Sequence, residues 1–232
     1  MSIVTVNKGG QAAPFMTSPP ADPSMGCCWF EDFLGAADGF TLAASGFAVK
    51  AEKSGVLYIA TEDTADSTAI SKAEVFTDLA DGESFAFNCR ARATTDRAAG
   101  DEISFGIAED IDATIGSTDT HCGFHITQGA TGAADNIAVK YKGDAKTVST
   151  DFTQASGAPA DYDATAWNTY GFLIQREGSN YRIRFFVNGQ QLGSDDLETD
   201  TVGDELFIAI FSTNDKGVWE IDWTMVTGPR AS

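Results

Sequence analysis

Short runs of alternating apolar and polar residues follow one another along most of the chain. In the stretch Arg182–Val187, three apolar side chains share one face of an extended backbone: Ile183, Phe185 and Val187. The opposite face carries Arg182, Arg184 and Phe186. This period of two residues predicts a half-buried β-strand.

The stretch Trp219–Met225 shows the same period. We expect its large apolar side chains to share one face: Trp219, Ile221, Trp223 and Met225. The opposite face would then carry Glu220, Asp222 and Thr224. The stretch Leu206–Phe211 is apolar on both faces, which is typical of a central strand that is covered on both sides.

Similar runs, rich in β-branched and aromatic residues, recur about every ten to fifteen residues between Gly, Asp, Asn or Ser. Asn188-Gly189 predicts a type I′ turn that closes a tight hairpin. A second hairpin is predicted between residues 122–128 and 137–143, across the Gly-rich GATGAADN. Residues 63–76 are the one candidate for a short helix. The pattern therefore predicts an all-β fold, an antiparallel sandwich or barrel.

Residues 1–28 differ from the rest of the chain. The stretch GGQAAPFMTSPPADPSMG is rich in Gly, Ala, Ser and Pro and cannot build a core, so we expect an extended arm. The arm is interpreted as a segment that orders on a neighbouring subunit, and a floppy tail is the alternative. The predicted partner-binding residues are Pro14, Phe15, Met16, Pro19 and Pro20. The β-sandwich domain would cover residues 29–232.

Composition and charge narrow the classes of function. The chain has 232 residues, 43% of them hydrophobic, and a formal net charge of −19. That charge argues against nucleic acid and anionic lipid as partners, because both require clustered Lys and Arg. No signal peptide or transmembrane run is visible, so we expect synthesis in a cytoplasm. The four cysteines do not form a disulfide framework and are expected to be reduced: Cys27, Cys28, Cys89 and Cys122.

The order of elements near the end of the chain resembles a known group of folds. Ala166–Ser194 contains a Trp, a strand, a turn, a strand ending in VNG and a short return strand, and ELFIAIFSTND and WEIDWTMV follow it. Together with the opening CWFEDFLG, this order resembles concanavalin A-like jelly rolls over residues 28 to 228. The group includes laminin-G-like domains, legume lectins and family 16 glycosidases. The resemblance implies two twisted antiparallel sheets packed face to face.

The stretch WEIDWT is the strongest enzymatic candidate. It resembles the Glu-x-Asp-x-Glu motif of family 16 glycosidases, in which alternate acids flank the sugar bond. Glu220 and Asp222 match the first two acids, and Thr224 stands in place of the third. A hydroxyl cannot protonate a glycosidic oxygen, so we expect no catalytic residue and no enzyme activity.

The sequence offers only weak candidates for a metal or a sugar site. His121 and His125 would lie about 13 Å apart on one strand face, too far to chelate one ion, with Cys122 on the opposite face. Cys27-Cys28 has no second pair. We expect no cofactor, and calcium is the alternative left open for an acidic loop: Asp195, Asp196, Glu198 and Asp200. The tryptophans are expected in the core, with sugar stacking as the alternative: Trp29, Trp167, Trp219 and Trp223.

Within its group, the chain resembles accessory virion proteins of tailed bacteriophages, because a Pro/Gly arm precedes an acidic sandwich. The resulting expectation is a homo-oligomeric capsid decoration or cement protein that binds the major capsid protein and lies on the virion surface. A lectin-like module for host adsorption is the first alternative, and a family 16-type glycosidase is the second.

Overall fold

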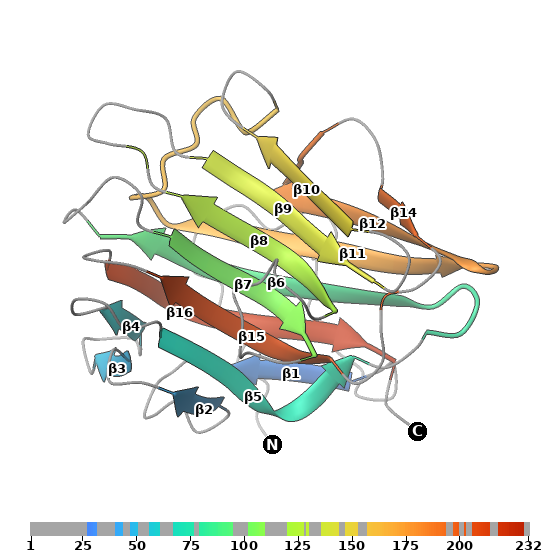
Figure 1. Ribbon diagram of the computed structural model, residues 1–232, viewed down its shortest axis with the longest axis horizontal. Coiled ribbons are helices and arrows are strands. Elements are labelled where there is room, and N and C mark those ends of the chain that lie inside the picture. The colour runs from blue at the N-terminus through green and yellow to red at the C-terminus, as the bar shows by residue number, and fades with distance from the viewer. Residues whose placement is uncertain are drawn as a thin grey trace.

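Two antiparallel β-sheets pack face to face in the computed structural model of the chain (Figure 1). The structure describes residues 27–31, 40–43, 47–50, 56–60, 67–76, 79–94, 102–109, 120–127, 129, 136–143, 147–152, 157–193, 197–199, 202, 206–213 and 218–229. None of these residues lies in a helix, so none forms a helix long and apolar enough to cross a membrane. The predicted antiparallel β-sandwich is confirmed.

Sheet A, which lies behind sheet B in Figure 1, has nine strands among the described residues. Its main order is β13-β12-β11-β6-β16-β4-β3, while β1 pairs with β16 and β14 pairs with β12. Its strands are β1 (Cys27–Glu31), β3 (Phe47–Lys50), β4 (Val56–Ala60), β6 (Ser84–Ala93), β11 (Asn168–Glu177), β12 (Asn180–Val187), β13 (Gln190–Gln191), β14 (Leu197–Thr199) and β16 (Val218–Gly228).

In the described part of the chain, sheet B has seven strands in the order β10-β9-β8-β7-β15-β5-β2. Its strands are β2 (Phe40–Ala43), β5 (Ser67–Phe76), β7 (Glu102–Ala108), β8 (His121–Thr127), β9 (Asn136–Lys142), β10 (Thr147–Phe152) and β15 (Leu206–Thr213). Every strand pairing in both sheets is antiparallel. The predicted hairpin of β8 and β9 is confirmed, with Thr127 paired to Asn136 next to the loop.

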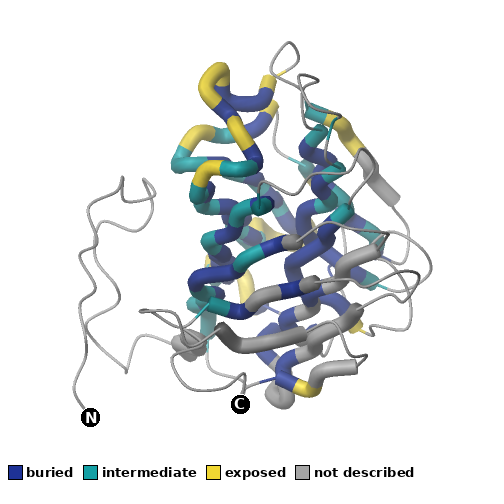
Figure 2. The backbone as a smooth tube through the Cα atoms, turned by 90° about the vertical axis from the view of Figure 1, so that its left-hand side faces the viewer, coloured by how far each residue is buried: buried dark blue, intermediate teal, exposed yellow. Residues whose placement is uncertain are grey.

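Aromatic side chains fill the space between the sheets, and buried residues recur along the strands of both layers (Figure 2). Phe124 of sheet B lies edge-on to Tyr170 and to Phe185 of sheet A, at centroid distances of 5.6 and 5.5 Å. Phe87 and Phe172, neighbours within sheet A, stack at 5.0 Å. Each fully buried Phe contributes about 1.5–3 kcal/mol of hydrophobic stabilisation, so this aromatic layer holds the two sheets together.

The hairpin of β12 and β13 turns where the sequence predicts it. Asn188 and Gly189 have φ angles of 52° and 79°, as a type I′ turn requires. The predicted alternation in β12 is confirmed as well, because Ile183, Phe185 and Val187 are buried whereas the intervening residues are only half-buried. The helix considered for residues 63–76 is wrong for its main part, since Ser67–Phe76 forms β5 and pairs with β15.

The first described strand joins the last one. β1 runs beside β16, with Cys27 paired to Gly228 and Phe30 paired to Met225. Cys27 and Cys28 are therefore the first residues of β1. The predicted arm lies outside the described residues up to Gly26, including Pro14, Phe15, Met16, Pro19 and Pro20.

Candidate functional site

The outer face of sheet A carries a group of side chains that we call the arginine cluster: Arg90, Arg92, Trp167, Glu220 and Asp222. Arg92 Nε donates to Glu220 Oε2 at 2.7 Å, and Arg90 Nη1 donates to Asp222 Oδ2. The two guanidinium groups lie over the Trp167 ring, 4.9 Å (Arg90) and 4.6 Å (Arg92) from its centroid. Both carboxylates are thus neutralised by arginines, and both arginines have a cation–π partner.

The sequence positions the arginines by simple alternation. Ala91 and Ala93 of β6 are buried against the core, so the residues between and before them, Arg92 and Arg90, project outward. β6 pairs with β16 so that Arg92 lies directly opposite Glu220. Opposite charges that face each other across two strands stabilise the pairing.

A hydrogen-bonded loop holds Trp167 against the arginines. The buried Asn168 donates from Nδ2 to the carbonyl oxygens of Asp163 and Ala166, both at 2.8 Å. Asn188 of the type I′ turn donates in turn to Asn168 Oδ1 at 2.8 Å. The position of the indole ring is therefore set by the loop before β11 and by the turn after β12.

The strand β16 does not keep the alternation that its sequence predicts. A register shift relative to β6 lies between Ile221 and Trp223, and it marks a β-bulge at Asp222. Trp219 and Ile221 before the bulge are buried, as are Thr224 and Val226 after it, whereas Trp223 and Met225 are half-buried. The prediction that Trp223 and Met225 share a face with Trp219 and Ile221 is therefore wrong, because one extra residue reverses the strand faces.

The bulge also corrects the comparison with the glycosidase motif. Thr224 does not follow Glu220 and Asp222 on the outer face but points into the core, paired with Cys89. The positions that follow on the outer face are Trp223 and Met225, opposite Arg90 and Asn88. Neither side chain can donate a proton to a glycosidic oxygen. This row of described residues therefore has two carboxylates, both held by arginines, and no third.

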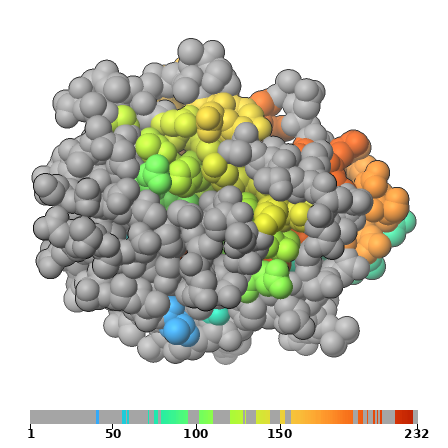
Figure 3. All heavy atoms as spheres, in the orientation of Figure 1, coloured from blue at the N-terminus to red at the C-terminus, as the bar shows by residue number. Residues whose placement is uncertain are grey.

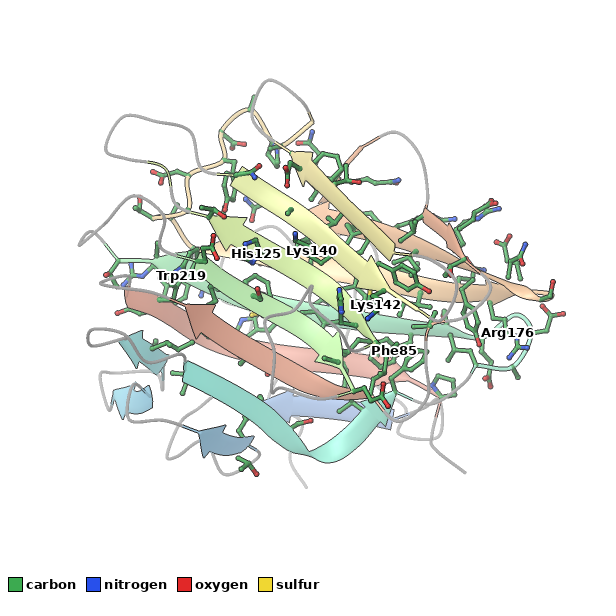
Figure 4. All side chains as sticks on the ribbon, in the orientation of Figure 1. Phe85, His125, Lys140, Lys142, Arg176 and Trp219 are labelled. Atoms are coloured by element: carbon green, nitrogen blue, oxygen red, sulfur yellow. The ribbon has the colours of Figure 1, made fainter. Side chains whose placement is uncertain are left out.

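The outer face of sheet B carries a second polar group, which faces the viewer in Figures 1 and 4. Ser104 Oγ and His125 Nδ1 lie 2.8 Å apart, and His125 Nε2 lies 3.6 Å from Glu102 Oε2. Lys140 lies beside His125, and Lys142 lies further along β9 (Figure 4). Figure 3 shows atoms of this part of the chain, coloured green to yellow, gathered in the middle of that face.

Burial is the main influence on the protonation of His125. It lowers the pKa of His125 from the ordinary 6.5, and Lys140 lowers it further, whereas Glu102 and Asp151 raise it. The net effect is a lowered pKa, so His125 is neutral at neutral pH. A neutral imidazole can exchange one hydrogen bond with the Ser104 hydroxyl, in either direction according to its tautomer.

Ser104, His125 and Glu102 are the residue types of a nucleophile–base–acid triad, but their surroundings do not fit that role. Ser104 is only 1% exposed. β7 pairs on one side with β8 and on the other with β15, so its peptide N–H groups belong to the sheet ladders. Acyl transfer needs free donors for the developing oxyanion. The trio instead fixes polar side chains on the outer face of sheet B.

Glycines make the floor of this face. Gly106 of β7 lies opposite Gly123 of β8. A Cβ at Gly106 would lie 2.2 Å from the carbonyl oxygen of Cys122, and one at Gly123 would lie 2.5 Å from that of Phe105. The backbones therefore approach each other more closely than any side chain at either position would allow.

The described residues that the sequence suggested for metal binding do not come together as a metal site. His121 and His125 lie on the outer face of β8, and Cys122 points into the core, as predicted. No group of three or more potential metal-ligating side chains occurs among the residues that the structure describes. Glu198 pairs with Arg182 at 3.7 Å. The other three calcium candidates lie outside the described residues: Asp195, Asp196 and Asp200.

The tryptophans differ from one another in burial. Trp219 is fully buried, as expected, whereas Trp167 and Trp223 are half-buried and belong to the outer face of sheet A. The side chain of Trp29 lies outside the described residues. Sequence reasoning did not single out Arg90 and Arg92. The alternation in NCRARA was a signal that both arginines face outward, but it did not reveal their partners.

Comparisons with known proteins agree on the fold. No family model and no curated protein matches the sequence. The structure is similar to the endo-1,3-β-glucanase from Streptomyces sioyaensis, with a TM-score of 0.64 and 15% identity over 92% of this chain and 100% of that one. It is also similar to the CBM2 module of the evolved Dit of Lactobacillus casei BL23 phage J-1, with a TM-score of 0.56 and 12% identity over 86% and 94%. The legume lectin-like domain from Entamoeba histolytica gives a TM-score of 0.55 and 11% identity over 84% and 92%. The chain has the concanavalin A-like jelly-roll fold that these structures share.

Proposed function

We propose that the protein is a structural protein of a bacteriophage virion, a decoration or cement protein that binds the major capsid protein and lies on the capsid surface. It would be made in the host cytoplasm and would act without catalysis, as a homo-oligomer. The acidic sandwich with a Pro/Gly arm supports the proposal, and so does the likeness in fold to a module carried by a phage protein.

The observation that carries the proposal is the arginine cluster. Arg and Trp are enriched at the centres of protein interfaces, where they contribute most of the binding energy. Arg90 and Arg92 are already fixed by Glu220 and Asp222 and by stacking on Trp167, so little side-chain entropy is lost when a partner covers them. The cluster offers an ordered surface without unpaired carboxylates in a chain whose net charge is −19.

Binding of this kind would stabilise a capsid because the same contact is repeated at every symmetry-related copy. A partner that binds only the assembled capsid lowers its free energy by mass action. Weak contacts at many symmetry-related copies add up through multivalency. An interface of ordinary size, about 800 Å² on each partner, would cover the cluster and part of the surrounding sheet face.

Co-sedimentation of purified full-length protein with capsids that lack it tests the proposal. We expect the protein to pellet with the capsids and to raise their melting temperature. Trp167→Ala should weaken binding by about tenfold or more, since interface tryptophans contribute heavily. Lys140→Ala, on the outer face of sheet B, is the matched control and should bind normally. Absence of binding by the unaltered protein would contradict the proposal.

Carbohydrate binding is the second candidate, and a specific observation favours it. The outer face of sheet B presents the half-buried His125 and Lys140, and the buried Ser104 holds His125 in place beside the close glycine pair Gly106 and Gly123. A few fixed polar groups that can set the orientation of a ligand suit a sugar. Binding on a glycan array that Lys140→Ala removes and Trp167→Ala leaves intact would favour this function over capsid binding.

A glycosidase function has less support, because Glu220 and Asp222 are both held by arginines and no third acid follows on that face among the described residues. Hydrolysis of a β-glucan by the purified protein, abolished by Glu220→Gln, would overturn the non-catalytic part of the proposal.

A further inference from the structure

Asn188 begins the type I′ turn after β12, and a glycine follows it. Asn188 and Gly189 are both half-buried, so each keeps some contact with solvent. Asparagine is a chemically labile residue. It is most labile before glycine, which has no side chain to hinder the peptide nitrogen that follows the asparagine. The turn therefore carries the residue pair that deamidation requires.

The carboxamide of Asn188 is held at both of its ends. Its Oδ1 accepts from the backbone N–H of Thr169 at 2.9 Å, and its Nδ2 donates to Asn168 Oδ1 at 2.8 Å. The backbone N–H of Asn188 also donates to the Thr169 carbonyl oxygen, at 2.7 Å. One side chain thus joins the turn after β12 to the loop that precedes β11.

These hydrogen bonds decide which end of each amide is the oxygen and which is the nitrogen. The Thr169 N–H can only donate, so the atom of Asn188 that faces it must be the oxygen. Asn168 Nδ2 must likewise face the carbonyl oxygens of Asp163 and Ala166, which can only accept. Asn168 is 2% exposed, so it has almost no solvent to turn toward. The contact between the two asparagines therefore needs an NH₂ group on Asn188.

We propose that Asn188-Gly189 is a deamidation site and that its modification releases Trp167 from the arginine cluster. The nitrogen of Gly189 attacks Asn188 Cγ and loses its proton, the Cγ–Nδ2 bond breaks, and ammonia leaves with that proton. The resulting succinimide takes up one water molecule and opens to an aspartate or an isoaspartate. Water is the only other reactant, and the peptide chain stays unbroken in both products.

The reaction replaces the donor of Asn188 with an oxygen. That oxygen faces Asn168 Oδ1, and two acceptors without a hydrogen between them repel each other. Asn168 cannot turn over to offer its NH₂ group, because its own oxygen would then face the carbonyl oxygens of Asp163 and Ala166. The turn and the loop must therefore move apart.

Trp167 depends on this contact, because it lies in the chain between two residues that form it. Asn168 follows Trp167, and the carbonyl oxygen of Ala166, before it, accepts from Asn168 Nδ2. The guanidinium carbons of Arg90 and Arg92 lie 4.9 and 4.6 Å from the centroid of the indole ring. When the loop moves away from the turn, the ring leaves the guanidinium groups. The cluster is ordered in the free protein, so this effect does not depend on capsid binding.

NMR of the full-length protein tests the effect on Trp167. The Nε–H groups of Arg90 and Arg92 report on the indole, because an aromatic ring displaces the signals of protons over its face. Trp167→Ala supplies the signal positions without the ring. In Asn188→Asp, which carries the side chain of the product, we expect both signals to move most of the way to those positions.

Asn180→Asp is the matched control. It adds the same charge at an exposed asparagine at the other end of β12, so both arginine signals should stay in place. Loss of overall stability alone would not move the signals of the folded protein. Unchanged signals in Asn188→Asp would overturn the inference.

Incubation of the natural protein in mildly alkaline buffer tests the reaction itself and starts from the folded chain, so it decides even if Asn188→Asp does not fold. Peptide mass spectrometry follows the conversion of Asn188 to an acid, and Asn180, which precedes Tyr181, is the internal control. We expect the acid to accumulate at Asn188 while Asn180 stays an amide, and the arginine signals to shift with the same time course. An Asn188 that stays an amide as long as Asn180, or that converts without a shift of the arginine signals, would contradict the proposal.

Discussion

Arg90 and Asp222 form an ion pair across β6 and β16 although 132 residues separate them in the sequence. The Asp222 side chain is 9% exposed and the Arg90 side chain 31%. Asp222 shares the outer face with Glu220, two residues before it, and lies at the β-bulge of β16. The ion pair therefore does two things. It holds β6 and β16 together, and it neutralises the Asp222 carboxylate on the proposed binding face.

Arg90→Met should destabilise the protein more than an equivalent change at an exposed ion pair. The substitution leaves the Asp222 carboxylate buried without its partner, which costs about 1–3 kcal/mol. Arg182→Met is the matched control: its pairs with Glu177 and Glu198 are much more exposed, so the cost is about 0–1 kcal/mol. Urea denaturation at pH 7 measures both. Equal losses would show that Asp222 does not depend on Arg90.

Gly106→Ala should be strongly destabilising. The new methyl group would lie 2.2 Å from the Cys122 carbonyl oxygen, which belongs to a paired strand and cannot move away without breaking the ladder. Overpacking of this kind costs about 1–3 kcal/mol or more. Ala108→Gly in the same strand creates no clash and should cost about 1 kcal/mol or less. Thermal unfolding followed by circular dichroism would reveal the difference, and normal stability of Gly106→Ala would contradict the close approach.

His125 should make stability depend on pH in a defined direction. Its pKa in the folded state lies below 6.5, because burial outweighs Glu102 and Asp151. As the pH falls, His125 in the unfolded state therefore binds a proton at a higher pH than His125 in the folded state. The contribution of His125 is fully present above about pH 6.5 and is lost as the pH falls toward the folded-state pKa.

Comparison of unfolding free energies between about pH 7.5 and pH 5 for the natural protein and His125→Gln isolates this effect. The carboxylates titrate in both proteins, so the difference reports His125. We expect the natural protein to lose more stability than the variant on acidification. A smaller loss in the natural protein would mean that the acids stabilise the charged imidazole.

Cys89 and Cys122 should resist thiol reagents while the protein is folded. Both are free and fully buried, and burial raises the pKa of each thiol, with Asp222 raising that of Cys89 further. Thiolate is the reactive form, so labelling of these two residues should follow global unfolding. Peptide mapping after iodoacetamide treatment, with and without urea, identifies the sites. Rapid labelling of Cys122 in the folded protein would show that sheet B opens locally.

Local sequence patterns predicted the β-sandwich, because the alternation of apolar and polar residues in a strand depends only on neighbouring positions. The alternation of β12 and the turn at Asn188-Gly189 needed no information from elsewhere in the chain. The bulge at Asp222 was not predicted, because it exists only relative to β6. The apolar residues of Trp219–Met225 alternate regularly in the sequence, so this pattern wrongly predicted that all of them share one face.

The candidate site was less predictable for the same reason. Arg92 and Glu220 lie opposite each other only once two distant strands pair, and Trp167 reaches them from a third segment. The buried state of Asn88, whose amide has no hydrogen-bond partner, is equally invisible in the sequence, where Asn88 is an ordinary polar residue in an alternating strand. Residue types could be listed from the sequence, but their contacts depended on the register of the whole sheet.

The pairing of β1 with β16 has a consequence for biosynthesis. During translation β1 emerges well before β16, its partner in sheet A among the described strands, which follows almost two hundred residues later at about 5–20 residues per second. Until Gly228 has left the ribosome tunnel, β1 cannot complete its pairing with β16. The nascent chain is exposed to unwanted strand partners for that interval, and chaperone demand should be highest then.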